Sequence, residues 1–141
     1  MGKFSKSKGS RGELEFCKAL ELTTGIRARR TAQVMGKTGQ AGDVVSDDLP
    51  DVHFEVKRTE RLNLRQAMEQ AVRDAEANLA APVPVVAHRM SRQPWLITVR
   101  LEDLSEFTYA VDQCLRHLET KPDKLLGATK AEAFDDDDDL A

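Results

Sequence analysis

Two short β-rich segments joined by a turn constrain the fold of this chain more than any other part of its sequence. Residues 42–45 and 52–58 flank a connection that contains Pro50-Asp51, a turn signal. Successive side chains of a strand point to opposite faces, so Glu55 and Lys57 share one face. The pattern therefore predicts a β-hairpin with an acid and a base on the same side.

Such a hairpin can hold a divalent cation. If its strands pair, Asp43 comes near Glu55, and two close carboxylates repel unless a proton or a cation neutralises them. Oxygen ligands with spare water positions suit Mg²⁺, for which Mn²⁺ can substitute, and Lys57 would then lie beside a metal-bound water. The alternative interpretation of these residues is a solvated hairpin with a cross-strand salt bridge.

Other residues compete for a place in this site. Asp47, Asp48 and Asp51 are alternatives to Asp43, but Asp51 is too close in sequence to Glu55 to lie across from it, and Asp43 leads directly into an apolar strand. His53 shares a face with Glu55. The three histidines lack metal-ligand spacing, and we expect a non-catalytic role for His53 and a packing role for Trp95.

Length and composition favour one intracellular domain. The chain has 141 residues, enough for a single domain with a real core. It has no apolar run of the ~20 residues that span a bilayer, and its basic start is not followed by a secretion signal, so we expect no membrane association and a cytoplasmic location. Cys17 and Cys114 fall on apolar helical stripes, which predicts buried thiols.

Charge is unevenly distributed along the chain. The net charge is -3, but residues 1–37 carry nine Lys or Arg against three Glu, whereas residues 120–141 carry seven acids against three Lys. A basic front of this kind can bind a polyanion through phosphate contacts. The acidic end is predicted to be disordered, because a run of like charge repels itself and buries nothing.

The first helix is predicted to begin at Ser10. Ser10 as N-cap with Glu13 three residues later resembles a capping box, and residues 1–9 precede it as a flexible basic arm. Glu13 nevertheless lies on the apolar stripe of the helix with Phe16 and Cys17. It can cap the helix, face a metal, or do both, whereas Glu15 falls on the polar side.

The remaining elements complete an α/β order. We predict strands at residues 26–34, 83–87 and 95–100 in addition to the hairpin. A helix capped by Asn63 should run to Pro82, and a last amphipathic helix should cover residues 104–118. The order is helix, three strands, helix, two strands, helix.

This order, the Asp43 and Glu55-Val56-Lys57 motif, and the opening Lys8-Gly9-x-x-x-Glu13 resemble the PD-(D/E)xK nuclease superfamily. The similarity is greatest to archaeal-type Holliday junction resolvases and related phage endonucleases. It implies a restriction-endonuclease-like core (α-β-β-β-α-β), with a central mixed sheet flanked by helices. Here an extra C-terminal strand and helix and a disordered acidic tail are added. The nuclease domain would be residues 10–119, between the arm 1–9 and the tail 120–141.

The resemblance also implies roles for single residues. Asp43, Glu55, Glu13 and the Val56 carbonyl would hold the metal, and Lys57 would act in catalysis. Gln70, from the second helix, would flank the site. The expected DNA-binding residues are Lys3, Lys6, Lys8, Ser10, Arg11, Arg29, Arg30, Lys37 and Gln70.

The function implied is that of a Mg²⁺-dependent endodeoxyribonuclease, foremost a Holliday junction or branched-DNA resolvase of DNA recombination and repair. Symmetric cutting of a junction implies a homodimer. If the chain is of phage origin, its location is the host cytoplasm. The alternatives are a nuclease for other DNA structures and a non-catalytic DNA-binding module on the same fold. The acidic tail would contact the chain's own basic surface or a replication or recombination partner.

Overall fold

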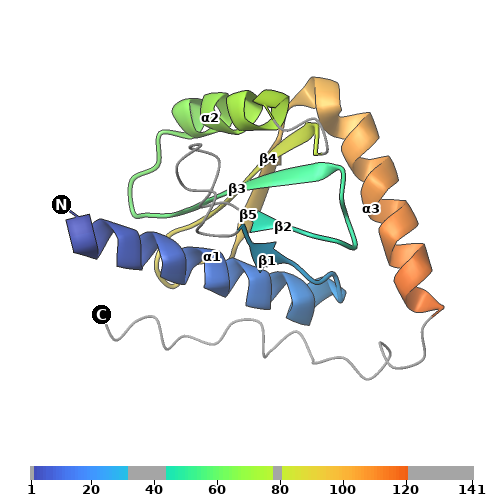
Figure 1. The fold of residues 1–141 in the computed structure, drawn as a ribbon, viewed down its shortest axis with the longest axis horizontal. Coiled ribbons are helices and arrows are strands. Elements are labelled where there is room, and N and C mark those ends of the chain that lie inside the picture. The colour runs from blue at the N-terminus through green and yellow to red at the C-terminus, as the bar shows by residue number, and fades with distance from the viewer. Residues whose placement is uncertain (1, 32–43, 78–80, 121–141) are drawn as a thin grey trace.

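The protein folds around a five-stranded sheet that helices cover on both faces (Figure 1). The computed structural model describes residues 2–31, 44–77 and 81–120, with side chains described from residue 11 onward. The elements are α1 (Gly2–Thr24), β1 (Arg29–Arg30), β2 (Val44–Val45), β3 (Val52–Arg58), α2 (Leu64–Ala77), β4 (Val83–Arg89), β5 (Leu96–Val99), a 3-10 turn (Leu101–Asp103) and α3 (Leu104–Glu119). This confirms the α/β class and the restriction-endonuclease-like core.

The sheet is mixed because of how its strands are connected. The spatial order is β1-β2-β3-β4-β5, and the two neighbours β3 and β4 are parallel while all other pairs are antiparallel. Parallel strands need a crossover connection, which α2 supplies. Val44 of β2 pairs with Phe54 of β3, which confirms the predicted hairpin.

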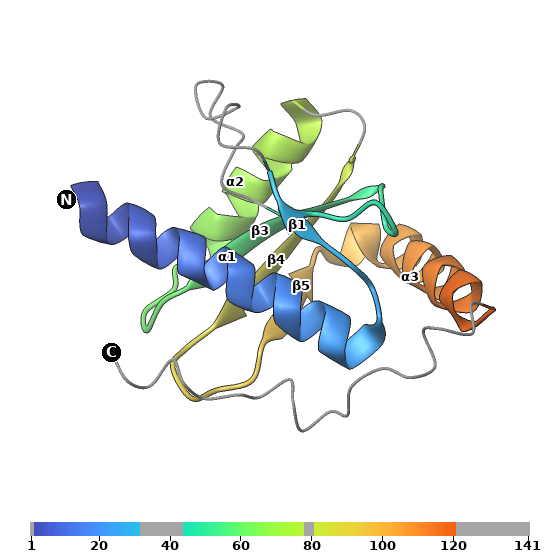
Figure 2. The ribbon, with the colours of Figure 1, turned by 60° about the horizontal axis from the view of Figure 1, so that its bottom comes forward.

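Alternation along β3 divides the hydrophobic core into two clusters, one on each face of the sheet. Val52 and Phe54 face the main core, which Phe16 of α1 and Leu118 of α3 complete. The opposite face of the sheet packs under α2, where Ala67 and Ala71 contact Val86 of β4. Figures 1 and 2 show α1 and α2 on opposite faces of the sheet.

Aromatic contacts and thiols fit the predicted core. The ring of Phe16 lies 5.2 Å from those of both Phe54 and Trp95, so Trp95 is a packing residue as predicted. Cys114 is buried and Cys17 is half-buried, and neither forms a disulfide. Burial raises the pKa of the Cys17 thiol to about 11, with a further contribution from the charge of Glu13.

The first helix begins earlier than predicted. It starts at Gly2, so Ser10 lies inside α1 and is not its N-cap, and residues 2–9 are helical instead of a flexible arm. A capping box is a local signal, and no proline interrupts the preceding residues to enforce a start at Ser10. The predicted capping role of Glu13 is therefore wrong.

The first strand is shorter than predicted. Residues 26–28 do not join the sheet, because side chains of the β2–β3 connection take their backbone hydrogen bonds. The amide of Arg27 donates to the Asp48 carboxylate at 3.0 Å, and the Ser46 hydroxyl donates to the Arg27 carbonyl. Residues 32–34 of the predicted strand lie outside the described residues.

The later elements agree closely with the sequence. The side chain of Asn63 accepts a hydrogen bond from the Gln66 amide at 3.0 Å, which confirms the predicted cap of α2. The strands β4 and β5 and the helix α3 lie within about two residues of their predicted bounds. Asp43, Lys37 and residues 121–141 lie outside the described residues.

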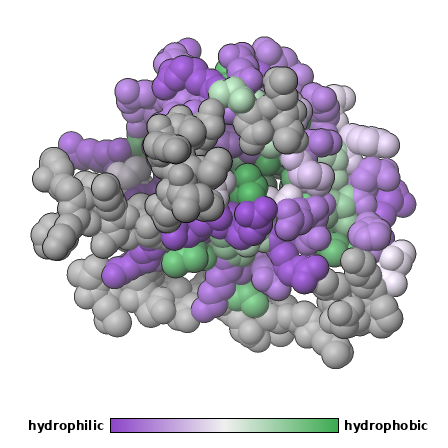
Figure 3. Space-filling view, viewed as in Figure 1, coloured by the Kyte–Doolittle hydropathy of each residue, from purple (hydrophilic) through white to green (hydrophobic). Residues whose placement is uncertain are grey.

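The space-filling view in Figure 3 shows a mixed surface on which hydrophilic residues predominate and hydrophobic ones appear in small groups. In the described part of the chain, no helix combines the length and apolar character that crossing a bilayer requires.

Close packing of α1 on β3 gives a stability prediction. A Cβ at the buried Gly12 would lie 3.0 Å from the Cβ of Arg58, closer than side chains normally pack. We expect Gly12→Val to lower the free energy of unfolding by about 1–3 kcal/mol through overpacking. Urea denaturation measures the change, and Lys18→Val at an exposed position of the same helix is the control. Equal midpoints for the two variants would contradict the close approach.

Candidate active site

The centre of the candidate site is the face of β3 that carries Glu55 and Lys57. Glu55 is 2% exposed, and the Lys57 ammonium lies 3.3 Å from its carboxylate. The same ammonium donates to the side-chain oxygen of Gln70 on α2 at 3.3 Å. Strand alternation thus sets the acid and the base on one face, as predicted, and α2 brings a third polar group to the lysine.

Glu13 adds a second carboxylate from the other side. It is 6% exposed, and Arg30 donates a hydrogen bond to it at 2.8 Å. Burial raises the pKa of the Glu13 carboxyl, and the negative charge of Glu55 adds to the effect, while Arg30 and Lys57 oppose it. Glu13 is therefore close enough to Glu55 and Lys57 to interact electrostatically, as its place on the apolar stripe suggested.

His53 and Asp74 also belong to this face. His53 is 3% exposed, and ligand atoms of His53, Glu55 and Asp74 lie within 4.8 Å of one another. The imidazole Nε2 of His53 is 3.8 Å from the Glu55 carboxylate. The sequence placed His53 on the face of Glu55 but missed Asp74. The available signal was its spacing, since Asp74 follows Gln70 by one helical turn.

These side chains fit a hard divalent cation. Glu55 and Glu13 offer carboxylate oxygens from two different elements, and Asp74 offers a third carboxylate beside Glu55. Oxygen donors of this kind are the ligands that Mg²⁺ and Mn²⁺ prefer. A single imidazole, from His53, is compatible with such a set. The donor chemistry therefore agrees with the divalent cation expected from the sequence.

The basic residues expected to contact DNA differ in their surroundings. Arg30 forms an ion pair with Glu13. Arg29 is exposed and forms an ion pair with Asp47 at 3.4 Å. Arg11 is exposed on α1. The side chains of Lys3, Lys6, Lys8 and Ser10 and the whole of Lys37 lie outside the described part of the structure.

The acids that compete with Asp43 have other partners. Asp47 contacts Arg29, and Asp48 forms an ion pair with Arg27 at 3.7 Å besides accepting the Arg27 amide. Asp51 is exposed, and its carbonyl accepts the Val83 amide at 2.9 Å, which joins β3 to β4 at their starts. The contacts of Asp47 and Asp48 thus stabilise the β2–β3 connection, away from the face of Glu55.

Glu15 has a structural role that the sequence did not reveal. The sequence pattern predicts a position on the polar side of the helix, but the Glu15 carboxylate accepts a hydrogen bond from Arg58 at 2.9 Å and lies 3.5 Å from Arg89. Both arginine side chains are less than 10% exposed. The prediction was wrong because these partners come from β3 and β4, far away in the sequence.

This ion-pair cluster gives a second stability prediction. Glu15→Gln removes a carboxylate from two buried guanidinium groups, so we expect the free energy of unfolding to fall by about 1–3 kcal/mol. Urea denaturation measures the loss, and Glu21→Gln at an exposed position of α1 serves as control. A loss no greater than that of the control would show that the cluster does not stabilise the fold.

Comparison with known proteins agrees with this geometry. A family model described as "phage putative PDDEXK endonuclease" matches residues 4–121, which covers all the described strands and helices from residue 4 onward. No curated protein matches the chain, and no solved structure matches it.

Proposed function

The chain belongs to the phage putative PDDEXK endonuclease family, and on that premise we propose that it is a Mg²⁺-dependent endodeoxyribonuclease that resolves branched DNA. The observation that carries the proposal is the contact of Lys57 with both Glu55 and Gln70 on the face of β3. A buried carboxylate beside a partly exposed lysine can hold a metal ion and offset the negative charge that develops when a phosphodiester is hydrolysed.

The proposed metal ligands are Asp43, Glu55, Glu13 and the Val56 carbonyl. Asp43 lies outside the described residues, but it directly precedes Val44, whose partner Phe54 adjoins Glu55 in the sequence. The involvement of Asp47 and Asp48 with arginines also favours Asp43 over those competitors. When bound, the metal acidifies a water molecule and stabilises negative charge on the scissile phosphate.

The protein's own residues orient the reaction. Lys57 is 32% exposed, so its ammonium can reach a substrate phosphate while Glu55 holds it in place. In this position it orients or helps deprotonate the attacking water and offsets charge that develops in the transition state. Gln70 fixes the ammonium from α2 and is a positioning residue.

The DNA would lie along the basic front of the chain. Arg11 and Arg29 are exposed, and we propose that they contact the phosphate backbone together with Lys37 and the α1 residues Lys3, Lys6, Lys8 and Ser10. Arg30 acts mainly on Glu13 and contributes to the DNA surface through its charge. Phosphate contacts of this kind weaken as salt concentration rises.

The kind of DNA that is cut is the most specific part of the proposal. Similarity to Holliday junction resolvases supports a four-way DNA junction as the substrate and a role in recombination or repair. Two symmetric cuts in such a junction imply a homodimer with two active sites. We place the reaction in the host cytoplasm, where phage DNA is replicated. The second candidate, a nuclease for other branched or linear DNA, uses the same residues and differs only in the substrate cut.

Cleavage assays test the proposal directly. We expect Mg²⁺ or Mn²⁺ to support cleavage of a four-way junction in preference to linear duplex, and chelation to abolish it. Lys57→Ala, Glu55→Gln and Asp43→Asn should each reduce kcat about 10²–10⁴-fold. Lys18→Ala, at an exposed position of α1, is the control.

Each alternative has its own outcome in this assay. Full activity of the Lys57 or Glu55 variant would contradict the proposed mechanism. Equal cleavage of linear duplex would support the second candidate function. DNA binding without metal-dependent cleavage of any substrate would identify a non-catalytic module.

The role of Gln70 gives a separate prediction. Gln70→Ala should lower kcat about 10-fold, as expected when a catalytic group is held less precisely, while KM for the junction changes little. Gln66→Ala, one turn earlier and exposed, should leave both unchanged. If the two variants behave alike, Gln70 does not position the lysine.

A further inference from the structure

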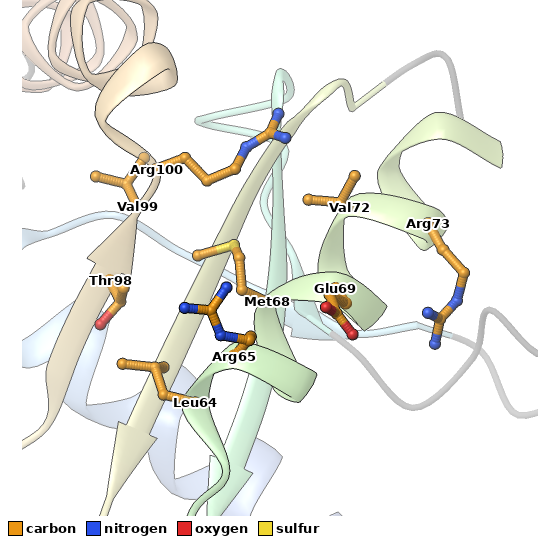
Figure 4. A pocket seen from close by; sticks show the side chains of 9 residues that line it. All are labelled: Leu64, Arg65, Met68, Glu69, Val72, Arg73, Thr98, Val99 and Arg100. Atoms are coloured by element: carbon orange, nitrogen blue, oxygen red, sulfur yellow. The ribbon is translucent and has the colours of Figure 1, made fainter.

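A groove between α2 and β5 lies apart from the proposed active site. Its volume is about 740 Å³, and its apolar lining comes from Leu64, Met68 and Val72 of α2 and Val99 of β5 (Figure 4). Helical residues two apart are rotated by about 200° around the helix axis, so Met68 faces away from Gln70. The groove and the Glu55–Lys57 face are thus on opposite flanks of the same helix.

Arginines surround this apolar groove. In Figure 4, Arg65 and Arg100 extend over it from its two walls, and Arg73 lies on the outer flank of α2. Arg100 is held by Asp103 at 2.7 Å and Glu102 at 3.6 Å. Within the described part of the chain, Arg65 and Arg73 form no ion pair.

One acid also lines the groove. Glu69 lies between Arg65 and Arg73 on α2 and offsets part of their charge. The charge of Arg100 is already met by Asp103 and Glu102, so the positive charge of the lining comes from Arg65 and Arg73, which outnumber Glu69. An apolar surface with a basic rim fits an aromatic or aliphatic side chain that is followed by acids.

We propose that the occupant of this groove is the chain's own C-terminal segment, residues 134–139. This segment consists of Phe134 followed by five aspartates, Asp135 to Asp139. The phenyl ring would pack against Met68, Val72 and Val99, and the aspartates would lie beside Arg65 and Arg73. The order of an aromatic residue and then a run of acids matches an apolar floor with arginines at its rim.

The length of the chain permits this docking. The groove adjoins the start of α3, because Arg100 directly precedes the 3-10 turn that leads into that helix. A helix of 16 residues is about 24 Å long. From Thr120 to Phe134 there are 14 residues, and an extended chain of that length spans up to about 50 Å. The segment is therefore long enough to return along α3 and reach the groove.

Docking in this groove leaves the face of Glu55 and Lys57 open, because α2 separates the two. The proposal is therefore independent of the nuclease function. It also gives the acidic segment a defined site, in contrast to diffuse attraction to the basic front of the chain.

Methyl NMR of the full-length protein tests the proposal. The chain has four methionines; Met68 lines the groove, whereas Met90 is 47% exposed after β4 and serves as an internal reference. We expect Phe134→Ala, and separately a variant with all five aspartates changed to Asn, to shift the Met68 methyl resonance. The Met90 resonance should stay in place. About 1 M NaCl, where screening acts over about 3 Å, should shift Met68 in the same direction as the Asn variant.

Substitutions in the groove complete the test. The double variant Arg65→Gln and Arg73→Gln should make the Met68 resonance insensitive to the aspartate substitutions, whereas Arg61→Gln, exposed just before α2, should not. A Met68 resonance that is identical in the wild-type chain and in both tail variants would overturn the proposal. A resonance that moves on dilution would also overturn it, since the occupant would then be the tail of a second copy.

Discussion

The burial of Glu55 in the middle of the sheet is the constraint on which the site depends. A carboxylate that is 2% exposed costs several kcal/mol to remove from water unless other groups compensate. Here Lys57, on the same strand face, and the imidazole of His53 lie within 4 Å of it. Several acids around one buried carboxylate favour the binding of a cation. Each further negative charge raises the free energy of the cluster unless a cation neutralises it.

The two helices that cover β3 contribute to this cluster from opposite sides. From α1 comes Glu13, oriented by Arg30, and from α2 come Gln70 and Asp74. The close approach of α1 to β3 depends on Gly12, and the ion pairs of Glu15 fix the same contact a few residues later. Packing and electrostatics therefore act together, since any displacement of α1 would move Glu13 relative to Glu55.

The helix α2 has two chemically different flanks. One carries polar groups toward the face of Glu55, and the other carries Leu64, Met68 and Val72 toward the groove beside β5. Between them runs the stripe of Ala67, Ala71 and Ala75, whose small side chains let the helix pack closely on the sheet. A single helix thus separates the face of Glu55, where we propose catalysis, from the apolar groove that we propose as a docking surface.

The sequence by itself determined the local features of this protein. Alternation on β3 gave the shared face of Glu55 and Lys57, and the Asn63 cap and apolar period gave α2, because these depend on residues close together in the chain. Only the tertiary structure decided the partners of Glu15, the place of Asp74 beside His53, and the short β1. Each of these rests on contacts between residues distant in sequence, for which no local pattern exists. The start of α1 at Gly2 was missed for another reason: a capping signal only favours a boundary, and the helix continued through it.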